Sequence, residues 1–128
     1  MNKKILITAS TFGVLAVSFG AFGAHVLKSR ISFHDLELWK TAVDYQFYHT
    51  LGLLFLATIP RSKGNLIKIS AWLFTLGILL FSGSLYLMAI KNQLTIFSTS
   101  VLGPATPIGG LFFILGWIGL LFTALRKK

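Results

Sequence analysis

The stretch Ile69–Ile90, ISAWLFTLGILLFSGSLYLMAI, contains 22 residues without a single charge and stands between Lys68 and Lys91. A helix rises about 1.5 Å per residue, so this stretch extends about 33 Å and can cross the roughly 30 Å hydrocarbon core of a bilayer. A backbone in lipid must satisfy its own hydrogen-bonding groups, which makes an α-helix the expected structure. The sequence therefore predicts a membrane-spanning helix over residues 69–90.

Three more stretches of similar character surround the first one. They cover residues 5–27, 42–59 and 107–125, and each ends beside basic residues or proline. The chain is 128 residues long, which allows one compact domain. We therefore expect a single membrane domain over residues 1–128, an all-α bundle of four transmembrane helices in contact with the lipid bilayer.

Composition excludes several function classes. Hydrophobic residues make up 55% of the chain and charged residues only 12%, about half of the quarter that is usual in soluble domains. The absence of cysteine excludes disulfides, thiol catalysis and iron–sulfur clusters. A net charge of +9 would suggest nucleic acid on a soluble protein. Here the basic residues cluster at the ends of apolar stretches, as in charges anchored at a bilayer surface, so no nucleic-acid partner is expected.

The distribution of basic residues predicts the orientation. In a four-span chain both termini and the middle connection share one side, which carries eight Lys and Arg residues: Lys3, Lys4, Arg61, Lys63, Lys68 and Arg126–Lys128. The other side carries four: Lys28, Arg30, Lys40 and Lys91. Basic loops stay in the cytoplasm, so we expect both termini inside. A cleavable signal peptide is the alternative for the first stretch, which is however longer than a typical signal-peptide core.

Two motifs mark helix starts. Ser32 followed three residues later by Asp35 is typical of an N-terminal cap, so we expect the second helix to begin near Phe33, outside the hydrocarbon core, and Trp39 to lie at the membrane interface. A second start is expected at 106–107, where proline suits the first helical turn. Residues 91–106 are expected to form a loop on or in the membrane surface, because serine, glycine and proline interrupt them.

Small residues recur at helical spacing in three of the stretches. Because helices in lipid associate through close packing, such strips predict helix–helix contacts. The expected packing residues are Ala16, Gly20 and Ala24 in the first helix, Gly77 in the third, and Gly109 and Gly116 in the fourth. The alternative is that one strip forms a homodimer face.

Polar residues within the spans are few and share one region. On the second helix, Asp44, Tyr45, Tyr48 and His49 fall within about 140° of one face. The predicted threading also brings polar side chains of the first and third helices into the outer half of the bundle. The candidate polar cluster is therefore His25, Asp44, Tyr45, Tyr48, His49, Ser84 and Tyr86.

This cluster has two interpretations. In the structural one, Asp44 pairs with Lys40 and a neutral His49 forms a hydrogen bond between helices. In the functional one, the cluster lines a binding pocket or a proton pathway, because ionisable residues inside a membrane are costly. The sequence contains no HExxH, P-loop or GxGxxG motif and no defensible Ser–His–Asp set, so no metal, cofactor or catalytic residue is predicted.

Several motifs together resemble a known family. They are GAFGAH at 20–25, YQFYH at 45–49, and TPIGG at 106–110 followed by Gly116 and Trp117. The set resembles domain-of-unknown-function family 423, small multi-pass membrane proteins of bacteria; Val26 stands where that family usually has glycine. The resemblance implies a multi-pass protein of the bacterial cytoplasmic (inner) membrane and implies no activity. It also suggests that the polar cluster coincides with the family's signature positions.

Two functions remain open on this basis. The leading hypothesis is a non-enzymatic bundle that is structural or binds lipid or a partner, with homo-oligomers possible. The alternative is a small proton-coupled transporter or carrier that uses Asp44 and His49. A water-filled cavity beside His49 would distinguish a transporter from a packed bundle.

Overall fold

The structure is a computed structural model that describes residues 1–60, 64–94 and 99–125. Within these ranges every regular element is helical, which confirms the predicted all-α class. The elements are α1 (Lys3–His25), the 3₁₀ helix η1 (Leu27–Ser29), α2 (Phe33–Thr58), α3 (Asn65–Gly77), the π-helical η3 (Ile78–Ser82), α4 (Gly83–Ala89) and α5 (Thr99–Leu125). Since α3, η3 and α4 follow one another without a break, residues 65–89 form one long helix.

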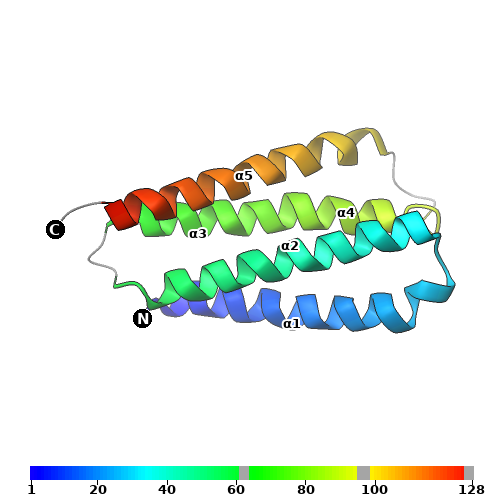
Figure 1. The fold of residues 1–128 in the computed structure, drawn as a ribbon, viewed down its shortest axis with the longest axis horizontal. Coiled ribbons are helices and arrows are strands. Elements are labelled where there is room, and N and C mark those ends of the chain that lie inside the picture. The colour runs from blue at the N-terminus through cyan, green and yellow to red at the C-terminus, as the bar shows by residue number, and fades with distance from the viewer. Residues whose placement is uncertain (61–63, 95–98, 126–128) are drawn as a thin grey trace.

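The long helices lie side by side in chain order (Figure 1). Neighbours run in opposite directions, so α1 begins and α5 ends at the same end of the bundle. The two most extensive interfaces are α1 with α2 and α3 with α5. Because α2 also packs on η3 and α4, it lies between two neighbours, and its polar side chains can face protein instead of lipid.

Three helices in the described ranges are long and apolar enough to cross a membrane: Lys3–Ser29, Asn65–Ala89 and Ser100–Leu125. With 26 residues, α2 has sufficient length but is not among them. Polar residues such as Gln46 and His49 lower its hydropathy, and both are buried against neighbouring helices.

The start of α2 follows from its first residues. The helix begins at Phe33, and Ser32 Oγ accepts a hydrogen bond of 3.1 Å from the Asp35 backbone N–H. This side-chain cap satisfies one of the amide groups that lack a partner in the first turn of a helix. The sequence places the start at the same residue.

The start of α5 differs from expectation. We expected a loop over 91–106, but α5 begins at Thr99 and includes Pro104 and Pro107. Each proline removes one helical hydrogen bond. The helix is held to α4 within this stretch, where the hydroxyls of Ser84 and Thr106 lie 2.6 Å apart. Residues 91–94 form a turn as expected, whereas residues 95–98 of the predicted loop lie outside the described residues.

Two apolar clusters form the core. One lies toward the end where the chain begins and centres on Leu53, Leu56 and Phe74. The other lies toward the opposite end and includes Trp39 and Leu85. Gln46, His49 and Thr50, three buried polar side chains of α2, lie between these clusters, and this layer is the candidate functional site.

Candidate functional site

Three polar side chains of α2 are buried within slightly more than one helical turn. Gln46 is 3% exposed, His49 5% and Thr50 2%. Burying a polar group without a hydrogen bond is costly, so each side chain needs a partner inside the bundle. Their partners come from all of the other long helices or from α2 itself.

Gln46 links three helices through both ends of its amide. Its Nε2 donates to the Phe12 carbonyl of α1 at 2.9 Å, and its Oε1 accepts from the Tyr86 hydroxyl of α4 at 2.8 Å. Thr50 Oγ1 donates to the Gln46 carbonyl at 2.7 Å. Gln46 was not among the candidate residues predicted from the sequence. Its uncharged amide within an apolar stretch is the signal that could have identified it.

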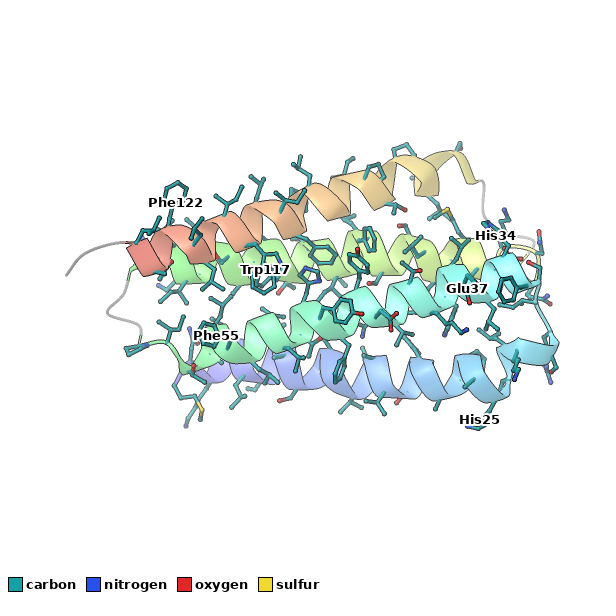
Figure 2. All side chains as sticks on the ribbon, in the orientation of Figure 1. His25, His34, Glu37, Phe55, Trp117 and Phe122 are labelled. Carbon is teal, nitrogen blue, oxygen red and sulfur yellow. The ribbon has the colours of Figure 1, made fainter. Side chains whose placement is uncertain are left out.

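His49 is held through both ring nitrogens. Its Nδ1 lies 2.7 Å from the Tyr45 carbonyl, and its Nε2 lies 3.1 Å from Trp117 Nε1 of α5. A carbonyl only accepts and an indole N–H only donates, so Nδ1 donates and Nε2 accepts. These partners assign the neutral Nδ1–H tautomer to His49. Figure 2 shows Trp117 reaching from α5 toward α2.

Aromatic rings enclose His49. The ring of Phe113 stacks on the imidazole with centroids 3.5 Å apart and an interplanar angle of 7°, and Phe74 approaches edge-on at 5.4 Å. A second proton on Nε2 would require the loss of the Trp117 hydrogen bond. In this arrangement His49 connects α2 to α5 and has no free nitrogen with which to exchange protons.

Other members of the predicted cluster lie elsewhere. His25 is exposed, and Figure 2 shows it on the side of α1 that faces away from α2. Asp44, Tyr45 and Tyr48 are also exposed, and Tyr48 reaches 55%. Ser84 forms a hydrogen bond with Thr106 of α5 and not with a residue of the His49 layer. Of the seven residues, only Tyr86 and His49 therefore take part with their side chains in the buried hydrogen bonds of this layer.

The expected pairing of Asp44 with Lys40 is wrong. Lys40 Nζ instead lies 3.0 Å from Glu37 Oε1, three residues before it on the same helix. A glutamate side chain is one carbon longer than an aspartate and can reach the ammonium group without strain. Both partners are about half exposed, so the pair contributes little to stability.

Trp39 lies near the start of α2 and packs against α1. It is buried, and its Nε1 donates to the Phe19 carbonyl of α1 at 2.8 Å. The indole occupies the space left by Gly23, where a Cβ would lie 2.6 Å from the ring. The Gly23–Trp39 contact shows that the ring faces α1, and the expected depth of Trp39 at the membrane interface stays a prediction.

The predicted packing residues fall into two groups. In α3 and α5, a Cβ on Gly109 would lie 2.4 Å from the Phe81 backbone N, one on Gly77 2.4 Å from the Phe113 ring, and one on Gly116 2.6 Å from the Phe74 ring. In α1, Ala16 is buried, Gly20 is half-buried and Ala24 is exposed. The glycines of the α3–α5 interface are therefore required by close contact, whereas the α1 strip is only partly used.

Among the pockets that open on the described part of the bundle, two have linings that include neither His49 nor Tyr86. One, of about 350 Å³, lies between α1 and α2 and includes Asp44 in its lining. The other, of about 580 Å³, lies between α1 and α3 at the opposite end. Within the described ranges no group of three or more His, Cys, Asp or Glu residues is arranged to hold a metal ion.

Comparison with known proteins identifies the family. The family model described as "Protein of unknown function (DUF423)" matches residues 19–110. The UPF0382 membrane protein SAB0533 of Staphylococcus aureus (strain bovine RF122 / ET3-1) is 40% identical over 124 residues, which cover 97% of both chains. The UPF0382 membrane protein YwdK of Bacillus subtilis (strain 168) is 38% identical over 126 residues, covering 97% of this chain and 98% of YwdK.

No solved structure matches the chain. The motifs that suggested the family from the sequence lie mainly inside the matched region, at 20–25, 45–49 and 106–110. The apolar helices of the fold agree with the description of the relatives as membrane proteins. The chain belongs to the DUF423 family, also named UPF0382, of uncharacterised membrane proteins.

Proposed function

We propose that this protein is a non-enzymatic four-span bundle of the bacterial cytoplasmic membrane that binds lipid and does not transport protons. The observation that carries this proposal is the double hydrogen bond of His49, which uses both ring nitrogens. A proton carrier needs a group that gains and loses a proton along a path, and His49 is enclosed by Phe113, Phe74 and Trp117.

The proposal includes α2 as the fourth span. At about 1.5 Å per residue, its 26 residues extend about 39 Å, enough to cross the hydrocarbon core. The common end of α1 and α5 supports an even number of crossings (Figure 1). Burial of Gln46 and His49 against neighbouring helices supports the placement of a less apolar helix within the membrane.

The proposal also places both termini in the cytoplasm. Lys3, Lys4 and Lys68 lie at that end, and the remaining basic residues of this side, Arg61, Lys63 and Arg126–Lys128, lie outside the described residues. A reporter fused after Lys128 should be active only as a cytoplasmic fusion, and one inserted between Ser29 and Ser32 only as an external one. The reverse pattern would overturn this orientation.

Reconstituted liposomes test the absence of transport. Wild-type protein should show no proton flux under an imposed pH gradient, and Asp44→Asn should behave identically because Asp44 is exposed outside the buried layer. The contrary outcome is a flux in the wild type that Asp44→Asn and His49→Gln both abolish while their melting temperatures hold. That result would establish the transporter alternative.

A further inference from the structure

A groove opens between α1 and α3 at the end of the bundle where the chain begins. Its volume is about 580 Å³, and Leu53 of α2 lies at its base. Ile5 and Ala71 make its walls apolar, while Lys4 and Lys68 line it with positive charge from opposite helices. The groove thus combines apolar side chains and two threonines along its walls with positive charge where both helices begin.

No acidic residue neutralises this end. The three acidic residues of the chain are Asp35, Glu37 and Asp44, and all of them belong to the first half of α2, at the opposite end of the bundle. A ligand in the groove therefore meets only positive formal charge from the side chains around it. A carboxylate or phosphate is favoured and an ammonium group is disfavoured.

The backbone adds to the positive potential. Both α1 and α3 begin at this end, and neither has a side-chain cap or an acidic residue in its first turn. The amide groups of a first helical turn carry partial positive charge and favour anions. Two uncapped helix starts beside Lys4 and Lys68 reinforce the preference that the lysines establish.

We propose that this groove binds an anionic phospholipid, with its phosphate between Lys4 and Lys68 and an acyl chain along Ile5, Leu53 and Ala71. The inference deepens the proposed function, since it rests on the placement of this end at a membrane surface and names the lipid class. Basic pockets between transmembrane helices suit anionic headgroups. Trp72, which is 66% exposed and also lines the groove, suits the headgroup level.

Native mass spectrometry of the full chain in detergent tests the proposal. Phosphatidylglycerol should remain bound in preference to phosphatidylcholine with the same acyl chains. The double variant Lys4→Gln/Lys68→Gln should weaken phosphatidylglycerol binding roughly tenfold or more. The matched control Lys28→Gln/Lys91→Gln removes the same charge from exposed positions at the opposite end and should leave binding unchanged.

A second variant separates the apolar part of the site from its charge. Thr8 lines the groove on α1, and Thr8→Phe adds a ring there without changing any charge. It should lower phosphatidylglycerol binding while the melting temperature in detergent stays close to the wild-type value. It also provides a test if the lysine variants fold poorly. Glycerophosphoglycerol, the headgroup without acyl chains, should not compete.

Three results would overturn the proposal. They are equal binding of the two lipids by the wild type, equal loss in both double lysine variants, and competition by glycerophosphoglycerol as strong as by the lipid. Binding that Thr8→Phe leaves intact would contradict the position of the acyl chain. Equal binding of the two lipids would remove this headgroup site and leave a lipid-binding bundle, whereas no binding of either lipid would also contradict the proposed function. Proton flux and reporter orientation test the other parts of that function separately.

Discussion

The two most extensive helix pairs are held together by different means. Between α3 and α5, glycines allow backbone and rings to approach closely, as at Gly116 against the Phe74 ring, and this close packing continues into η3, where Gly109 of α5 meets the backbone of Phe81. Between α1 and α2, side-chain donors reach backbone carbonyls of the neighbouring helix, as Trp39 does to Phe19 and Gln46 to Phe12. The first pair depends mainly on missing Cβ atoms, whereas the second combines one such position, Gly23 against the Trp39 ring, with individual polar groups.

This difference shows two ways to stabilise helices where lipid removes most of the hydrophobic driving force. Close approach strengthens dispersion contacts over a long interface, and small residues make it possible. A buried hydrogen bond acts at one point and becomes a cost when one partner is lost. Close approach can also leave a polar group unsatisfied. The buried Oγ of Ser70 points at Gly119 across the interface and has no hydrogen-bond partner among the described residues.

The largest effect is expected for Gly109→Ala, where α5 packs on η3 in the continuation of the α3–α5 contact. The added Cβ would lie 2.4 Å from the Phe81 backbone N, and backbone cannot move aside as a flexible side chain does. We expect a loss of about 3 kcal/mol or more, measured as a fall in melting temperature in detergent. Gly103→Ala in the same helix is the control, since nothing lies within 4 Å of its Cβ position. Equal melting temperatures for both variants would refute close packing at Gly109.

Gln46→Leu should produce the next largest effect, in the α1–α2 pair. It leaves the Tyr86 hydroxyl and the Phe12 carbonyl without their partner, at a cost of about 1–3 kcal/mol. Adding Tyr86→Phe should restore part of the loss, because one orphaned group is then removed. Tyr48→Phe on the exposed face is the control and should have little effect. Strictly additive losses in the double variant would contradict the direct bond.

Trp117→Phe should have a smaller effect, because it removes one hydrogen bond and keeps an aromatic ring. The expected loss is about 1 kcal/mol, and Nε2 of His49 becomes free. Nitrogen NMR of labelled histidine should show the Nδ1–H tautomer in the wild type and a changed Nε2 signal in the variant. A wild-type spectrum of the Nε2–H tautomer would contradict the assigned bond pattern.

Gly20→Ala in the α1–α2 pair should have the smallest effect. Its Cβ would lie 3.5 Å from Val43 Cγ1, which is ordinary van der Waals contact. We expect a change within about 0.5 kcal/mol in melting experiments. Gly116→Ala is the comparison in the other pair, where the Cβ would meet the buried Phe74 ring at 2.6 Å, and it should be clearly worse. Similar losses for the two variants would remove the distinction between the pairs.

The sequence by itself determined the elements that depend on local chemistry. Uncharged apolar stretches specify helices because lipid leaves the backbone no other partner, and Ser32 with Asp35 specifies where α2 begins. Glycines at helical spacing also marked Gly77, Gly109 and Gly116 as contact positions. These features require knowledge of only one helix at a time.

Only the tertiary structure decided which polar groups meet. Helical periodicity places Gln46 and His49 on α2, but it does not specify the rotation or depth of the helices around them. Those quantities brought Trp117 to His49 and Tyr86 to Gln46, and they left His25 on the outer side of α1. The start of α5 at Thr99 was likewise visible only in the tertiary structure, since two prolines near its beginning predict an interruption from local chemistry alone.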